Sequence, residues 1–244
     1  MWGLTPIDQM MCRITYRKAN YSGQFTPILS RPSITYPAVG GGINWGSVSV
    51  DTQRGLMVVN TLHLANLNRL VPKTQGTVVK GGFEGGVITF PMEGTPFYLA
   101  QFPFLSPLFV PCQRPPFGSI HVFDIATRRL LWSKPLGTAA GSGPFGIASH
   151  IPLRLGAPNF GGSMTTASGL VFIATTQDRL LRAFDIGNGR EVWSTTLPAV
   201  GASMPISYVS PRTGRQYIVI AAGGHFAIPG PDASAIVAYA LPEH

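Results

Sequence analysis

The stretch 123–132 reads FDIATRRLLW, and the stretch 184–193 reads FDIGNGREVW. In both stretches an aspartate stands eight residues before a tryptophan, and the two tryptophans are 61 residues apart. Each copy predicts a strand ending at the aspartate, a tight polar turn and a second strand ending at the tryptophan, because Asp and Asn bond their own backbone and Gly accepts a positive φ. A hairpin that recurs at a long period indicates a repeat architecture, and repeated strands favour the blades of a β-propeller. Two unrelated hairpins in a β-sandwich are the alternative.

In the propeller interpretation, the aspartate and the tryptophan that the two copies share have structural roles. We expect Asp124 and Asp185 to fix their turns, and Trp132 and Trp193 to pack between neighbouring sheets. These four residues are therefore not assigned to a functional site.

The composition predicts an ordered protein with many short strands. Of the 244 residues, 45% are hydrophobic and only 11% are charged, and the chain has 29 Gly and 22 Pro. Low charge argues against disorder, and frequent Gly and Pro fit strands joined by turns. No apolar run reaches the roughly 18 residues of a membrane span, and residues 1–11 lack the pattern of a signal peptide, so we expect neither in this sequence.

The formal net charge of +8 comes from scattered cations. No block of five or more Lys and Arg occurs, and no aromatic ladder of a nucleic-acid module accompanies them, so nucleic acid is not an expected partner. A solvated basic surface, an anionic ligand and an anionic membrane surface all remain open.

The two cysteines, Cys12 and Cys112, are a hundred residues apart. This spacing excludes a metal-binding pair of the Cys-x-x-Cys type. Whether the two thiols form a disulfide is open at this stage, because sequence spacing does not establish that they meet.

The chain reads as four β segments. The first is a hairpin over 47–60, and the next two contain the tryptophan hairpins. The fourth holds strands over 217–222 and 235–241. Residues 66–118 are rich in Pro, Gly and aromatic side chains, and we expect an ordered excursion there because such aromatic residues do not stay solvated.

Several stretches together resemble the membrane-bound glucose/quinate/shikimate dehydrogenases that use pyrroloquinoline quinone (PQQ). They are GLVFIATTQDRLLRAFD at 169–185, the glycine pair before His225, IVAYALP at 236–242, MWGLTPIDQ at 1–9, FLSP at 104–107 and PC at 111–112. The resemblance covers nearly the whole chain in the family's order.

The resemblance implies an all-β, eight-bladed propeller of the quinoprotein type, of which this chain contains about four C-terminal blades. Residues 1–244 are then the C-terminal part of the propeller domain, and the N-terminal blades and the membrane anchor are absent. The implied location is the periplasmic face of the bacterial inner membrane. The missing N-terminal part of the same protein is an implied partner.

The implied activity is oxidation of a cyclic polyol by PQQ, with a divalent metal (Ca²⁺ or Mg²⁺) as Lewis acid and membrane ubiquinone as electron acceptor. In the family, the principal base lies upstream of the region matched here. We therefore assign no catalytic residue in this chain and expect the chain alone to be inactive.

Residue-by-residue matching to the family gives the candidate site. Cofactor-binding positions are Asn60, Asp178, Arg179, Asn44 and Trp45, with Asn60 also a candidate metal ligand. The alternatives are an ordinary strand-end turn for Asn60, blade packing for Trp45 and a surface Asp/Arg turn pair for the two adjacent charges.

Substrate selection is expected at His225 and Arg179. His225 matches a family histidine that affects substrate use, although a lone histidine is often structural. Glucose-oxidising members carry a neutral amide at the position that matches Arg179, so this cation favours an anionic cyclic alcohol such as quinate or shikimate. Glucose oxidation is the alternative within the family. A non-catalytic propeller scaffold is the alternative outside it.

Overall fold

The computed structural model describes residues 1–38, 40–74, 81–84 and 87–241. The chain divides into two compact units. The first unit comprises Met1–Gly41, His63–Arg114 and Pro144–Gly146. The second comprises Gly42–Leu62, Pro115–Gly143 and Ile147–His244.

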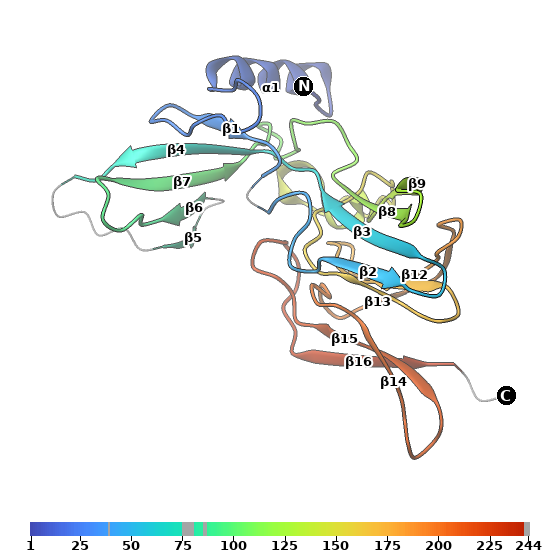
Figure 1. Ribbon diagram of the computed structural model, residues 1–244. Coiled ribbons are helices and arrows are strands. Elements are labelled where there is room, and N and C mark those ends of the chain that lie inside the picture. Colours follow the sequence, from blue (N-terminus) through green and yellow to red (C-terminus); the bar gives the residue numbers. More distant parts are fainter. Residues whose placement is uncertain (39, 75–80, 85–86, 242–244) are drawn as a thin grey trace. The chain divides into compact units, whose positions relative to one another are not determined.

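The second unit holds three antiparallel sheets (Figure 1). The first sheet has the order β2-β3-β8-β9, with β2 Val48–Asp51, β3 Leu56–Leu62, β8 Gly118–Asp124 and β9 Arg129–Pro135. The second has the order β10-β11-β12-β13, with β10 Ser163–Thr165, β11 Leu170–Ile173, β12 Leu180–Asp185 and β13 Glu191–Thr196. The third has the order β14-β15-β16, with β14 Ile206–Val209, β15 Gln216–Ala222 and β16 Ala235–Ala240. In each sheet the strands appear in chain order, as in a propeller blade.

The two tryptophan hairpins have the same local geometry. Asp124 Oδ1 accepts hydrogen bonds from the Thr127 backbone and hydroxyl at 2.7 and 2.8 Å, and Asp185 Oδ1 accepts from the Gly187 backbone N–H at 2.8 Å. Four residues after each aspartate the backbone turns left-handed, with φ of 57° at Arg128 and 66° at the matching glycine. Both hairpins also carry a register shift next to the phenylalanine that precedes the aspartate. The predicted repeat is therefore confirmed at the level of the backbone.

The sheets of the second unit stack face to face through alternate residues of β11. Val171 and Ile173 pack with residues of the first sheet, including Val58 and Ile120, in one buried cluster. Phe172, on the opposite face of β11, packs with residues of the third sheet in a second cluster. Because side chains alternate across a strand, a continuous apolar run is what a sheet covered on both faces requires.

Trp132 joins the first sheet to the second. Its Nε1 donates to the carbonyl of Ile186 at 2.7 Å, and the side chain packs against the cluster between these sheets. A Cβ at position 189 would lie only 2.7 Å from the indole, so this close contact requires glycine. The φ of 66° at the same position also favours glycine. Trp193 makes edge contacts with Phe172 and Tyr239, at ring-centroid distances of 6.5 and 5.4 Å, and is 40% exposed. Packing between neighbouring sheets is confirmed for both tryptophans.

The first unit is the excursion between β3 and β8 together with the N-terminal residues. Its five-stranded sheet has the order β1-β4-β7-β6-β5, with β1 Ser33–Thr35, β4 Asn66–Pro72, β5 Gly82–Glu84, β6 Val87–Phe90 and β7 Phe97–Pro103. For the described residues of 66–118 the predicted order is confirmed in part: Phe104 lies buried in the core of this unit, whereas Phe109 is 59% exposed. Residues 75–80 and 85–86 of this segment lie outside the described residues.

One helix, α1 (Pro6–Lys18), was not predicted. Its start signals are nevertheless present in the sequence. Thr5 caps the helix by accepting a hydrogen bond from the Asp8 backbone at 3.1 Å, and Pro6 stands at the first turn. The remaining short elements are 3-10 turns at Ala139–Gly141 and Pro144–Gly146. Among the described residues, no helix has the length and apolar character needed to cross a bilayer.

Candidate functional site

All the predicted site residues lie at the same end of their sheets. In an antiparallel sheet, the start of the first strand and the connection between the second and third strands lie at one end. The residues that precede β2, end β3, connect β11 to β12 and connect β15 to β16 occupy these positions. They include Asn44, Trp45, Asn60, Asp178, Arg179 and His225.

Asn60 is held by the segment that precedes β10. Its Nδ2 donates to Oδ1 of Asn159 at 2.7 Å and to the carbonyl of Gly161 at 2.9 Å. Asn159 is itself anchored by donating to the carbonyl of Thr61 at 3.0 Å. Both asparagines are buried. Within the described residues, Oδ1 of Asn60 is consequently a buried acceptor without a protein partner.

An aromatic cluster, defined as Trp45, Phe160, His225 and Phe226, includes one residue of the same segment, Phe160. The Phe160 ring stacks on the imidazole with centroids 4.7 Å apart and planes at 16°. The centroid of the Trp45 indole lies 5.7 Å from that of Phe160 and 5.2 Å from that of the imidazole. The ring of Phe226, the residue after His225, has its centroid 4.7 Å from the imidazole. The structure thus brings two predicted site residues, Trp45 and His225, into one cluster of neighbouring aromatic rings.

The sequence analysis did not predict Phe160 and Asn159 as site residues, although a repeated tripeptide marks their position. Residues 44–46 read Asn-Trp-Gly before β2, and residues 159–161 read Asn-Phe-Gly before β10. The second copy is the same type of sequence at the matching place in the next sheet. Comparing the two positions would have identified the segment that holds Asn60.

The imidazole of His225 has one ring nitrogen bonded to the backbone and one without a partner among the described residues. Its Nδ1 accepts from the Ala227 backbone N–H at 3.1 Å, so in the neutral ring the proton resides on Nε2. Nε2 is buried and finds no partner among the described residues. Burial lowers the pKa of His225 below its ordinary value, which favours the neutral imidazole at pH 7. The group is therefore suited to donating one hydrogen bond rather than to supplying charge.

The segment 198–202 ties three parts of the candidate site together. Arg179 Nη1 donates to the carbonyl of Pro198 at 3.1 Å, and the backbone N–H of Gly224 donates to Val200 at 3.1 Å. Trp45 Nε1 donates to the carbonyl of residue 202 at 3.3 Å. Arg179 is partly exposed and has a φ of 58°. Its backbone N–H donates to the carbonyl of Thr176 at 3.0 Å, and the remaining N–H groups of its guanidinium make no hydrogen bond within the described portion of the chain.

Asp178 faces protein groups on both carboxylate oxygens. Oδ2 accepts from the backbone and hydroxyl of Thr138 at 2.8 and 2.9 Å, and Oδ1 accepts from the Thr176 hydroxyl at 2.6 Å. Arg182 donates to both oxygens from a side chain that is only 4% exposed. Burial alone would raise the pKa of Asp178, but the hydrogen bonds and charge of Arg182 outweigh it and hold the pKa below its ordinary value.

The Asp178 contacts differ from the surface pair considered from the sequence. Its charged partner is the buried Arg182 of β12, and the adjacent Arg179 turns to Pro198 instead. Arg182 was missed because a single arginine inside an apolar strand gives no sign of where its partner lies. Five hydrogen bonds saturate the carboxylate and fix the β11–β12 connection against Thr138.

No cluster of three or more His, Cys, Asp or Glu side chains occurs among the residues that the structure describes. The buried Oδ1 of Asn60 is a possible single oxygen ligand for a hard divalent cation, which takes oxygen donors.

In the first unit, Cys12 and Cys112 form a disulfide across the hundred-residue separation. Both are buried beside Ile34 and Phe104. Disulfides persist mainly in oxidising compartments.

Comparison with known proteins identifies the family. Residues 1–218 match the PQQ family described as "Glucose/ethanol/alcohol dehydrogenase, beta-propeller domain". The chain belongs to this family. The predicted family and the predicted fold class, an all-β quinoprotein propeller of which this chain holds a part, are both confirmed.

Relatives with three different substrate names resemble this PQQ-family chain to similar degrees. It is 42% identical over its whole length to a "Probable quinate dehydrogenase (quinone)" of Xanthomonas campestris pv. juglandis, covering 31% of that protein. It is 40% identical to the "Glycerol dehydrogenase large subunit" of Gluconobacter oxydans and 37% identical to the "Quinoprotein glucose dehydrogenase" of Escherichia coli, covering 34% and 31% of them. The chain therefore spans about three tenths of the length of these relatives.

A solved structure supports the fold of this PQQ-family chain. The quinohemoprotein alcohol dehydrogenase of Comamonas testosteroni matches 88% of the chain with a TM-score of 0.53 and 21% identity, and the match covers 29% of that structure. At this identity the match concerns the architecture alone.

Proposed function

We propose that this chain is the C-terminal part of a PQQ-dependent dehydrogenase that oxidises a cyclic polyol, preferably quinate or shikimate, and passes the electrons to membrane ubiquinone. Two buried polar atoms at this end of the sheets carry the proposal, Oδ1 of Asn60 and Nε2–H of His225, because neither has a hydrogen-bond partner among the described residues. A buried polar atom without a partner costs free energy, so its persistence favours a ligand that completes the hydrogen bond.

The residues present fit the chemistry of PQQ. PQQ is a flat tricarboxylate quinone, and the aromatic cluster supplies flat surfaces while Nε2–H of His225 supplies a donor. The free N–H groups of Arg179 suit a carboxylate, because guanidinium forms charge-assisted, forked hydrogen bonds. When bound, PQQ supplies the two-electron acceptor for oxidation of an alcohol carbon.

For the metal, we propose that Asn60 contributes one oxygen ligand to a Ca²⁺ or Mg²⁺ ion and that the other ligands come from the missing N-terminal part. Such an ion serves as a Lewis acid beside the quinone. The described residues bring no three acidic, His or Cys side chains together that could hold the ion by themselves.

We also assign the general base to the missing part. Asp178 is the one acidic candidate at this end of the sheets that the sequence suggested, and its oxygens already accept five hydrogen bonds. Asp178 instead positions the β11–β12 connection, so that the backbone at Arg179 keeps its left-handed conformation.

Arg179 supports an anionic substrate over a neutral one. Its side chain is held at one nitrogen by Pro198, which leaves N–H donors for a substrate carboxylate. Quinate and shikimate carry a carboxylate, whereas glucose and glycerol do not. Glucose oxidation is the second candidate, since the glucose relative is only five points less identical than the quinate relative.

The proposed location is the periplasmic face of the inner membrane. The Cys12–Cys112 disulfide supports an oxidising compartment. The missing N-terminal part of the protein is proposed to supply the remaining blades and the membrane anchor.

The test uses the complete protein reconstituted with PQQ and Ca²⁺, assayed with quinate, shikimate, glucose and glycerol. Arg179→Asn should raise KM for quinate about ten- to a hundredfold and leave neutral polyols unchanged, because a charge-assisted contact contributes roughly 1.5–3 kcal/mol. Asn also tolerates the left-handed backbone, so the variant should fold.

Arg190→Asn is the matched control, since this exposed arginine lies in the β12–β13 turn at the other end of the same sheet. It should leave KM for quinate unchanged. Equal losses on charged and neutral substrates with Arg179→Asn would mean that Arg179 binds PQQ or supports the turn. That result would refute the substrate assignment and favour glucose. Absence of any PQQ-shifted absorbance in the complete protein would instead favour a non-catalytic scaffold.

A further inference from the structure

Helix α1 exposes an apolar stripe to the surroundings of the first unit. Ile7 is 71% exposed, Met10 is 52% exposed and Ile14 is 39% exposed, with Met11 beside them. Residues spaced by three, four and seven positions share one face of a helix, so these side chains form a continuous stripe. Isolated exposed apolar residues need no explanation, but a stripe along a whole helix face marks an interaction surface.

The opposite face fixes the orientation of the helix. Cys12 is bonded to Cys112 and is buried, and Asp8 is buried with Oδ2 accepting from the Leu4 backbone at 3.0 Å. The helix is therefore attached to the first unit through its 8/12 face. It cannot rotate to bury the apolar stripe without breaking the disulfide.

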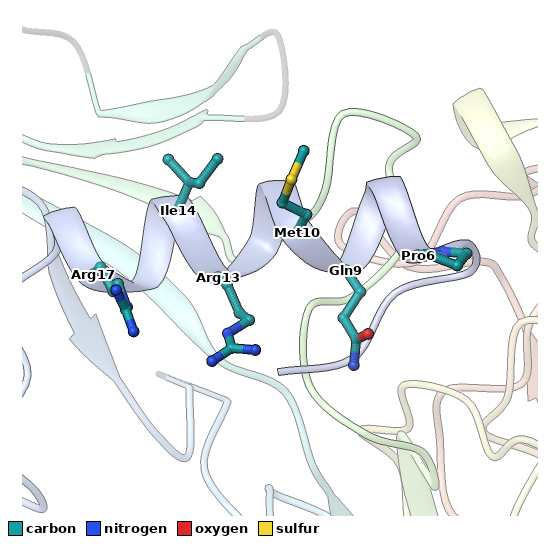
Figure 2. Close-up of a pocket in the computed structure, with 6 residues that line it drawn as sticks. All are labelled: Pro6, Gln9, Met10, Arg13, Ile14 and Arg17. Carbon is teal, nitrogen blue, oxygen red and sulfur yellow. The ribbon is translucent and has the colours of Figure 1, made fainter.

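Cations flank the stripe. Figure 2 shows Met10 and Ile14 projecting to one side of α1, and Gln9, Arg13 and Arg17 projecting to the other. The groove between these two rows is lined by Pro6, Gln9, Met10, Arg13, Ile14 and Arg17.

Arg13, Arg17 and the adjacent Lys18 form no ion pair with any carboxylate that the structure describes. The only acidic residue of the helix, Asp8, lies on the buried face. The charged side chains on the exposed side of α1 are therefore all cations, and they lie beside the apolar stripe.

We propose that α1 lies on an anionic phospholipid surface, with the Ile7/Met10/Ile14 stripe among the upper acyl chains and with Arg13, Arg17 and Lys18 at the headgroup phosphates. An apolar stripe bordered by unpaired cations is the pattern of a helix that lies in the membrane interface. A purely apolar protein groove would leave these cations without counter-charges, whereas lipid phosphates supply them at the required position. Apolar burial and the polybasic margin together provide the two signals that stable interfacial binding needs.

The experiment uses the complete protein in nanodiscs, with a benzophenone amino acid in place of Met10. On illumination, nanodiscs that contain phosphatidylglycerol should give a phospholipid adduct on the helix peptide. A benzophenone in place of Ile125, an exposed turn residue of the second unit, is the control and should give no adduct. Intact-disulfide mass and circular dichroism check that each variant is folded.

Charge is tested in the same system. Arg13→Gln/Arg17→Gln should lower the lipid adduct at position 10 at least fivefold, because each cation at an anionic surface is equivalent to about a fivefold change in binding. Arg128→Gln/Arg129→Gln removes the same charge from a turn of the second unit and should leave the adduct unchanged. Replacing phosphatidylglycerol by phosphatidylcholine should act like the Arg13/Arg17 variant.

The proposal is overturned if position 10 captures protein instead of lipid, if it captures nothing, or if the adduct ignores both the lipid charge and Arg13/Arg17. The readout needs neither PQQ nor substrate. It therefore succeeds or fails separately from the proposed enzymatic activity.

Discussion

Replacing Asp178 by asparagine tests whether its buried contacts hold the candidate site together. The change preserves the side-chain shape and removes one negative charge. An amide also puts two N–H donors where Thr138 and Arg182 already donate, so it loses acceptors and creates donor–donor contacts. We expect the main effect to be on stability rather than on cofactor affinity alone.

The magnitude follows from the burial of the ion pair. The Asp178 and Arg182 side chains are 3% and 4% exposed, so neutralising the first leaves the guanidinium in the interior. Breaking a buried ion pair at one partner costs about 3–5 kcal/mol. Glu191 remains 3.8 Å from Arg182 Nε and offsets part of that cost, which favours the lower end, about 3 kcal/mol. For a protein of this size that corresponds to a fall in Tm of roughly 6–12 °C.

The assay is thermal unfolding of the wild type and the variant at several pH values. Because the pKa of Asp178 is lowered in the fold, its stabilisation is fully present above the unfolded value of about 3.9 and is lost as pH falls through the folded pKa. The difference in Tm should therefore be full at neutral pH and should shrink below about pH 4.

Asp185→Asn is the matched control on the same sheet. Asp185 Oδ1 accepts two backbone N–H groups in a turn, and an amide oxygen can replace it there. The control should change stability by no more than about 0.5 kcal/mol. Unchanged melting of Asp178→Asn at neutral pH would refute the buried-pair reasoning and return Asp178 to a direct role at the cofactor.

Three further predictions concern the blades, the histidine and the isolated chain. Trp132→Ala should cost about 3–5 kcal/mol in unfolding experiments, and Trp193→Ala about half as much, because Trp193 is 40% exposed; equal losses would contradict the assigned packing. The pKa of His225, measured by NMR, should lie below 6.5, so protonation of the unfolded chain comes first and stability falls as pH drops through 6.5; a raised pKa would mean that an anionic partner was missed. The chain alone should show no turnover with PQQ, Ca²⁺ and any polyol, and robust turnover would contradict placing the base and most metal ligands outside it.

The strands that close on Trp132 and Trp193 could be predicted because their signals are local. A turn depends on residues two to four positions apart, and the aspartate and glycine that form it are adjacent in sequence. Alternation along β11 depends only on the pleat of the strand. For the same reason, the start of α1 was readable at Thr5 and Pro6, and it was overlooked because the rest of the chain pointed to strands.

The hydrogen-bond and ion-pair partners of the site residues could not be predicted in this way, because they depend on which sheet ends meet after the sheets have stacked. The sequence placed Asp178 beside Arg179, but only the fold gave the carboxylate to the buried Arg182 and turned Arg179 toward Pro198. Likewise, the family resemblance pointed to Asn60, whereas the asparagine that holds it lies 99 residues away.

The sequence by itself determined the repeated hairpins, the family and the positions at which a cofactor site should be sought. The tertiary structure decided that Cys12 meets Cys112, that Phe160 stacks on His225, and that one face of α1 stays uncovered in its unit. The reason is that local turns and strand periodicity are set by short-range sterics and hydrogen bonds, whereas contacts across a hundred residues arise only when buried apolar faces bring whole sheets and helices together.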